Sequence, residues 1–84
     1  MDEKEVGSVD HYFDKISVGM IKLSDAVKVG DKVHIKGKDY DFSQDVSSMQ
    51  INRVPAQAAN AGDLISIKVN QKVRQGDKVY KVAA

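Results

Sequence analysis

The chain has 84 residues and a formal net charge of +1, with 42% hydrophobic and 30% charged residues. These values allow one folded domain with a single core and exclude wholesale disorder. The chain contains no cysteine, which excludes disulfides and thiolate metal sites. Its N-terminus, MDEKEVG, is polar and no apolar run approaches roughly 18 residues, so we expect neither a signal peptide nor a membrane span. These features predict a cytoplasmic protein.

Strand signals begin near the N-terminus, after a tail at residues 1–5 that we expect to be flexible. The first two candidate strands are residues 5–13 and 16–23. In the third, KVHIK at 32–36, apolar and polar residues alternate strictly, which places Val33 and Ile35 on one face of a sheet.

A short turn at 37–39 leads into a long extended segment at 40–54. Residues 55–61, PAQAANA, predict a loop with a candidate helical turn, and Pro55 at its start cannot donate to a central strand ladder. Two more strands are expected, at 64–69 and 78–82.

Six short strands separated by turns predict an all-β protein, a small six-stranded antiparallel closed β-barrel in one domain spanning residues 1–84. Closure is favoured because it removes exposed sheet edges. The alternating residues predict a core that includes Val9, Val18, Val33, Ile35, Met49, Ile51, Ile65, Ile67, Val69 and Val79.

Three Gly-Asp pairs each precede a predicted strand: Gly30-Asp31, Gly62-Asp63 and Gly76-Asp77. Glycine adopts positive φ at little cost, and aspartate can accept hydrogen bonds from nearby backbone amides. We therefore interpret the pairs as structural turns. The alternative is a phosphate or metal site built on the same residues.

The stretches SVGMIKLSDAVKVGDKVHIKG, VSSMQINRVPAQAANAGDLISIKV and VRQGDKVYKV together resemble the second, β-barrel domain of translational GTPases of the elongation factor Tu type. The resemblance covers roughly residues 6–82, and the chain is also similar to short stand-alone elongation factor-like proteins. It implies the fold of translation-factor domain 2 and a role in contacting the aminoacyl end of tRNA or the ribosome. A related barrel also ends some collagenase-like peptidases.

The sequence departs from translational GTPases in two places. It has no G-x-x-x-x-G-K-[ST] phosphate loop, so no GTPase activity and no nucleotide cofactor is assigned. The connection NQK before the last Gly-Asp pair is shorter than in the factors. The motif of their tRNA pocket is not recognisable in this sequence, so the residues of that pocket cannot be carried over one by one.

Candidate catalytic groups are few, and none has a recognisable context. His11 and His34 lack the helical H-x-x-x-H spacing of a metal site, while Asp39 and Asp41 flank a turn where solvated carboxylates are common. Ser47–Ser48 is not in a G-x-S-x-G motif. We expect a non-enzymatic protein with no catalytic residue, no metal ligand and no cofactor.

Positive charge gathers toward the C-terminus: residues 64–84 contain five basic residues and one acidic residue, whereas residues 1–25 contain six acidic and three basic residues. This asymmetry is compatible with a basic face that binds tRNA, rRNA or the ribosome, and with charges evened out by folding. The candidate RNA-binding residues, with a tyrosine for base stacking, are Arg53, Lys68, Lys72, Arg74, Lys78, Tyr80 and Lys81.

Protein docking is the alternative function. The small-residue segment VPAQAANAG, at 54–62, is suited to packing against a larger surface. The partner would be a translational GTPase, the ribosome, or an RNA-modifying or peptidase-like enzyme, without direct RNA binding.

Overall fold

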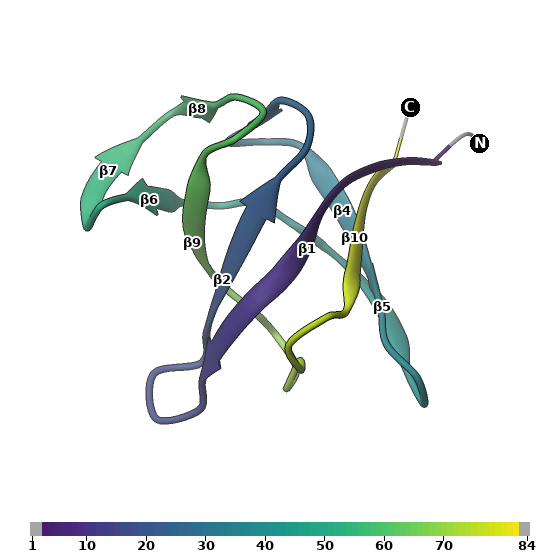
Figure 1. Ribbon diagram of the computed structural model, residues 1–84. Helices are drawn as coiled ribbons and strands as arrows, with labels where there is room; N and C mark the ends of the chain where they lie inside the picture. Colours follow the sequence, from purple (N-terminus) through teal and green to yellow (C-terminus); the bar gives the residue numbers. More distant parts are fainter. Residues whose placement is uncertain (1–2, 83–84) are drawn as a thin grey trace.

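A computed structural model describes residues 3–82, and in this range the chain is built of β-strands and turns, which confirms the all-β class (Figure 1). No helix in that range is long and apolar enough to cross a membrane. The strands are β1 (Glu3–Phe13), β2 (Val18–Leu23), β3 (Val27–Lys28), β4 (Lys32–Lys36), β5 (Asp41–Asp45), β6 (Met49–Ile51), β7 (Val54–Ala56), β8 (Ala58–Ala59), β9 (Leu64–Lys68) and β10 (Lys78–Val82).

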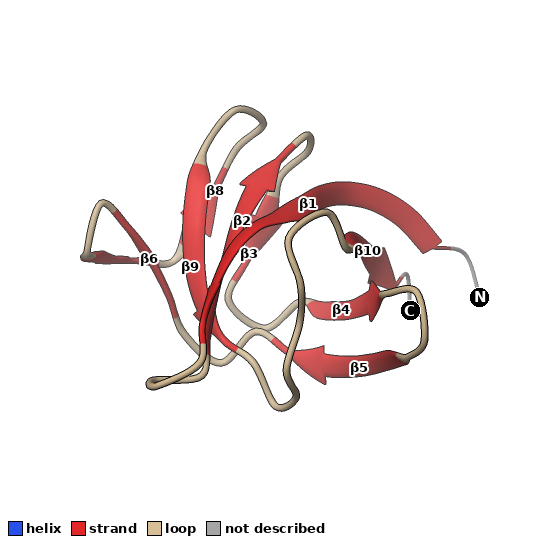
Figure 2. Cartoon of the chain, turned by 60° about the horizontal axis from the view of Figure 1, so that its bottom comes forward, coloured by secondary structure: helices blue, strands red, loops and turns tan. Residues whose placement is uncertain are grey.

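Eight of these strands form one antiparallel sheet in the order β5-β4-β10-β1-β2-β9-β6-β7, and β3 and β8 form a separate pair. Figures 1 and 2 show the large sheet curving around the interior of the molecule. In the described range the sheet keeps two edges, β5 and β7, that do not pair with each other. The expected six-stranded closed barrel is therefore not supported.

The long strand β1 lies at the centre of the sheet and pairs with both β10 and β2. Its register shifts between Glu5 and Gly7 on one side and between Val9 and His11 on the other. Such bulges bend a strand and increase its twist, which lets β1 serve both halves of the curved sheet.

The core is made of inward-facing aliphatic residues from almost every strand. Val6, Ile21, Ile35, Ile65 and Val79 each expose 1% of their surface or less. Eight of the ten predicted core residues are buried; Val18 and Ile51 are half-exposed. Val18 was assigned to the wrong face, because β2 carries apolar residues on both of its faces.

Several predicted boundaries differ from the structure. Residues 3–5, expected in a flexible tail, lie in β1, whereas residues 1–2 lie outside the described range. The segment 40–54 is divided among β5, β6 and the start of β7. Residues 55–61 contain no helical turn but parts of two short strands, with Pro55 on the edge strand β7.

The three Gly-Asp pairs occupy turns of one kind. Gly30, Gly62 and Gly76 have φ values of 99°, 92° and 95°, which L-residues rarely adopt. In each turn the aspartate accepts a hydrogen bond from the backbone N–H three residues earlier, over 2.8–3.0 Å. The aspartate thus satisfies a donor that the turn leaves free.

The last of these turns is also linked to the β4–β5 hairpin. The Tyr40 hydroxyl donates a hydrogen bond to Asp77. Burial, with the Asp77 carboxylate beside it, raises the pKa of Tyr40 to about 12. The hydroxyl therefore stays protonated and keeps its donor role across the ordinary pH range.

Candidate functional site

The outward faces of the sheet differ in polarity between its two halves. On β4, His34 and Lys36 point outward, and Ser43 does so on their partner β5. On β2 and β9 the outward positions include Val18, Met20 and Leu64 instead. An antiparallel sheet that faces water normally carries polar residues on that face, so the apolar outer surface of β2 and β9 requires an explanation.

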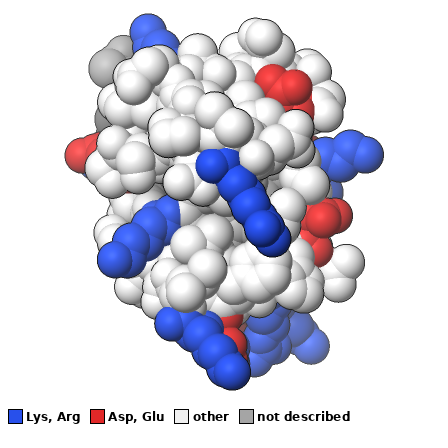
Figure 3. Space-filling model, turned by 90° about the vertical axis from the view of Figure 1, so that its left-hand side faces the viewer, with Lys and Arg blue, Asp and Glu red and all other residues white. Residues whose placement is uncertain are grey.

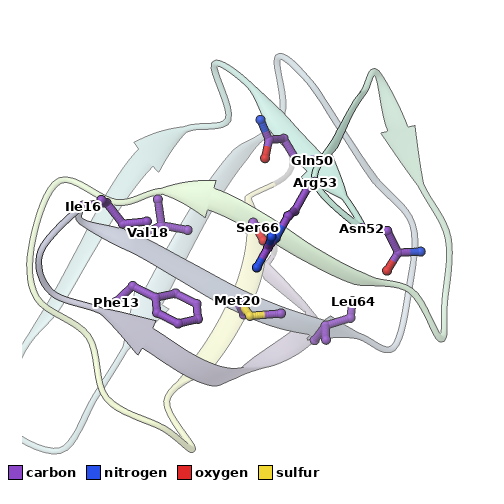
Figure 4. A pocket seen from close by; sticks show the side chains of 9 residues that line it. All are labelled: Phe13, Ile16, Val18, Met20, Gln50, Asn52, Arg53, Leu64 and Ser66. Atoms are coloured by element: carbon purple, nitrogen blue, oxygen red, sulfur yellow. The ribbon is translucent and has the colours of Figure 1, made fainter.

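A groove of about 660 Å³ lies on this apolar outer surface. The pairing Met20↔Ser66↔Gln50 runs across its floor, joining β2, β9 and β6. The β1–β2 turn and the β6–β7 turn form its two sides (Figure 4). The residues that line it are Phe13, Ile16, Val18, Met20, Gln50, Asn52, Arg53, Leu64 and Ser66.

Large apolar side chains in the groove are open to solvent. Phe13, Ile16 and Leu64 expose 40%, 61% and 36% of their surface, and they are three of the four exposed large hydrophobic residues in the described range. The His11 ring packs edge-on against Phe13 with centroids 4.6 Å apart, which supports the aromatic ring at the edge of the groove. A solvated cluster of this kind is typical of a surface that another molecule covers.

The structure distributes the seven candidate RNA-binding residues over separate parts of the surface. Arg53 lies in the β6–β7 turn and lines the groove, and Lys68 ends β9. Lys72 and Arg74 lie in the connection between β9 and β10. The side of the molecule drawn in Figure 3 likewise shows Lys and Arg side chains spread over a largely uncharged surface, apart from a group at its lower edge.

The remaining three candidates lie on β10, and they point to different faces. Lys78 and Tyr80 are on the outer face, where the Lys36 ammonium lies 4.6 Å from the centre of the Tyr80 ring. Lys81 turns the other way, donates to the Ala26 carbonyl over 3.2 Å and lies 3.9 Å from Asp31. These residues do not form one continuous basic strip, and their binding to RNA remains a prediction.

An ion-pair cluster fastens the beginning of β1 to β4 and β5. His34 Nδ1 lies 2.6 Å from Glu3, His34 Nε2 lies 3.1 Å from Asp41, and Lys36 Nζ lies 3.0 Å from Glu3. The hydrogen bond to Glu3 raises the pKa of His34 despite partial burial, and Asp41 adds to the effect. The same bond to His34, followed by that to Lys36, lowers the pKa of Glu3.

This cluster is arranged for ion pairing rather than metal binding. Its two carboxylates contact opposite nitrogens of the His34 ring, so they do not converge with the ring on one point. Among residues 3–82, no three His, Asp or Glu side chains could hold a metal ion together. Of the other candidates, Asp39 lies in the β4–β5 turn, and Ser47 and Ser48 lie between β5 and β6.

Sequence reasoning missed the groove, although two signals pointed to it. VGMIKL and LISIK each have apolar residues on both faces, whereas a strand with one face toward water normally has polar residues on that face. The second signal is Asn52-Arg53 between two apolar residues, where asparagine is favoured in a two-residue hairpin turn. We had placed both residues inside an extended segment, so Arg53 was predicted as a surface cation without its apolar neighbours.

Comparison with solved structures defines the class of domain. Two crystal structures of the C-terminal domain of a "putative U32 peptidase" from Geobacillus thermoleovorans superpose with TM-scores of 0.89 and 0.87. The alignments cover 95% and 90% of this chain, and 93% and 96% of those chains, at 17% and 16% identity. At this identity the likeness establishes the fold, an all-β domain of the kind that ends that peptidase.

The sequence itself is similar to one curated protein, the uncharacterized protease MJ0090 of Methanocaldococcus jannaschii. The two are 39% identical over 77 residues, or 90% of this chain. The chain spans only 19% of the length of that relative. No protein-family model matches the chain.

These comparisons correct the family resemblance drawn from the sequence. The likeness to elongation factor Tu-type domain 2 and to stand-alone elongation factor-like proteins is wrong, because the similar proteins are a protease and C-terminal peptidase domains. Gly-Asp turns and short alternating strands are features that any small curved sheet can share, so they did not distinguish the two families. The comparisons support the other relative, a barrel-like domain that ends a peptidase.

Proposed function

We propose that this domain is a non-catalytic docking module that packs through its apolar groove against the larger part of a peptidase-like protein. The observation that carries the proposal is the group of Phe13, Ile16 and Leu64, three large apolar side chains that line one groove and are open to solvent. Covering such a cluster removes apolar surface from water and favours association. We place this interaction in the cytoplasm, as the cysteine-free composition suggests.

The relatives support a partner of this kind. Four-fifths of the M. jannaschii protein lies outside the segment that matches this chain. The G. thermoleovorans structures are likewise C-terminal domains of a longer protein. A domain next to a larger body can bury an apolar face against it, and interfaces between domains are comparable in size to those between transient partners.

The test measures binding between this domain and the M. jannaschii relative from which the matching 77 residues have been removed. Isothermal titration calorimetry should detect binding by the wild-type domain. Leu64→Asp and Ile16→Asp should each abolish it, since a carboxylate on the groove would have to be desolvated in the complex. Ser43→Asp, which adds the same charge on the polar outer face of β5, is the matched control and should bind normally.

Because Ile16 lies in an exposed turn, its substitution should leave the fold intact, which a thermal melt would verify. Absence of binding by the wild-type domain would refute the proposal. So would equal binding by the wild-type domain and both groove variants.

A further inference from the structure

Three cationic residues lie in or beside the apolar groove, and the one acidic residue in the turns on its two sides, Asp14, does not line it. Arg53 lines the groove itself. Lys22 and Lys68 lie on the same outer face, where they pair across the strands with Leu64 and Val18. No Asp or Glu lines the groove, and none of these three cations takes part in an ion pair within residues 3–82. The surface is therefore complementary to an apolar segment that carries negative charge.

The position of Arg53 in the backbone is costly for an arginine. Ile51 pairs with Val54, so Asn52 and Arg53 form a two-residue hairpin turn, with φ values of 51° and 65°. Such turns favour Asn-Gly, because glycine has no steric penalty at positive φ. An L-residue other than asparagine or aspartate pays about 1–2 kcal/mol there. The chain nevertheless has arginine at this position, and its side chain is directed into the groove (Figure 4).

We propose that Arg53 binds a carboxylate of the docked polypeptide, next to an apolar side chain that occupies the groove. The inference rests on the proposed docking function and adds the chemistry of the docked segment: an Asp or Glu beside a large apolar residue. A guanidinium suits this role because it can donate two parallel hydrogen bonds to one carboxylate. The apolar side chains of Phe13, Met20 and Leu64, which line the groove, would together with the docked segment shield that pair from water and strengthen it.

The experiment uses a short fluorescein-labelled peptide that alternates leucine with glutamate, and a second peptide with glutamine in place of glutamate. Fluorescence anisotropy should show that the wild-type domain prefers the glutamate peptide by roughly tenfold or more, as expected for a charge-assisted hydrogen bond. Arg53→Gly should remove this preference, while Arg74→Gln, which removes a positive charge away from the groove, should retain it.

The Arg53→Gly variant also tests whether binding is lost only because the fold is destabilised. It should leave the urea midpoint unchanged or raise it, because glycine relieves the strained turn. Loss of the glutamate preference in a variant of undiminished stability therefore reports the side chain itself.

Other outcomes would overturn the inference. It is wrong if Arg53→Gly keeps the preference, if neither peptide binds, or if a labelled single-stranded RNA binds the groove more tightly than the glutamate peptide and depends on Arg53. Two outcomes distinguish a failure of the carboxylate contact from a failure of the docking function. If Leu64→Asp abolishes binding to the truncated relative but Arg53→Gly does not, the docking function is supported and the carboxylate contact is wrong. If neither variant matters, both proposals are wrong.

Discussion

Gly7 and Gly62 are both required by the fold, but for different physical reasons. A Cβ on Gly7 would lie 2.5 Å from the backbone oxygen of Lys22, in the ladder between β1 and β2. A Cβ on Gly62 would meet nothing within 4 Å, and its constraint is the φ of +92°. One position therefore lacks space, whereas the other needs a conformation that glycine adopts freely.

We predict that Gly7→Ala destabilises the domain by roughly 1–3 kcal/mol, the usual cost of overpacking, because the obstructing atom belongs to the backbone and cannot move alone. Urea unfolding would measure this loss. Gly62→Asn is the control and should cost clearly less, since asparagine tolerates positive φ better than other side chains. An unchanged midpoint for Gly7→Ala would show that β1 and β2 can separate locally at no cost.

At the scale of elements, β9 contributes to two surfaces at once. Ile65 and Ile67 point into the core, and Leu64 points into the outer groove. Ile67 is only 3% exposed and lies across from Met49 of β6. The same short strand thus holds the fold together and forms part of the proposed docking face.

We expect Ile67→Ala to lower the free energy of unfolding by about 2–5 kcal/mol, through lost burial and the cavity left behind. Leu64→Ala, on the same strand, should cost less than about 1 kcal/mol, because its side chain remains partly solvated in the folded state. Chemical denaturation of both variants would compare them. Equal losses at the two positions would contradict the assignment of faces on β9.

The elements predicted best from the sequence are the three strands that each follow a Gly-Asp turn. Residues 32–36 and 78–82 match β4 and β10 in full, and 64–69 exceeds β9 by one residue. The prediction failed between 40 and 61, where β6, β7 and β8 have only two or three residues each, too few to establish a period. The groove depends on which apolar residues of β2 and β9 face solvent, and that follows from tertiary packing rather than from local pattern.

At the scale of the whole molecule, side chains link parts of the sheet that backbone ladders leave apart. Gln44 is buried on the edge strand β5; its amide nitrogen donates to the Lys68 carbonyl and its amide oxygen accepts from the Asn70 N–H, both over 2.8 Å. This amide imitates a backbone pair and connects β5 to the end of β9. The sequence predicted closure by strand pairing, on the ground that closure removes exposed edges. A single side-chain bridge leaves no periodic signal in the sequence, so this link was not predicted.

The cluster of Glu3, His34 and Asp41 is a second long-range link, and it makes stability depend on pH. The folded state raises the pKa of His34, so the stabilising contribution of the imidazolium is fully present below the ordinary value of 6.5. That contribution is lost as pH rises through the higher pKa of the folded state. Glu3 has the opposite sign: its lowered pKa gives a contribution that is present above 4.5 and lost as pH falls.

We therefore predict that the free energy of unfolding declines as pH is raised through the neutral range, and that His34→Gln removes most of this decline. Urea unfolding at intervals from about pH 5 to about pH 8 would measure it. His11→Gln is the control and should keep the wild-type dependence, because His11 forms no ion pair within residues 3–82. If the His34 variant declined as steeply as the wild type, the charged cluster would make no net contribution, and the beginning of β1 would be held by its ladder with β10.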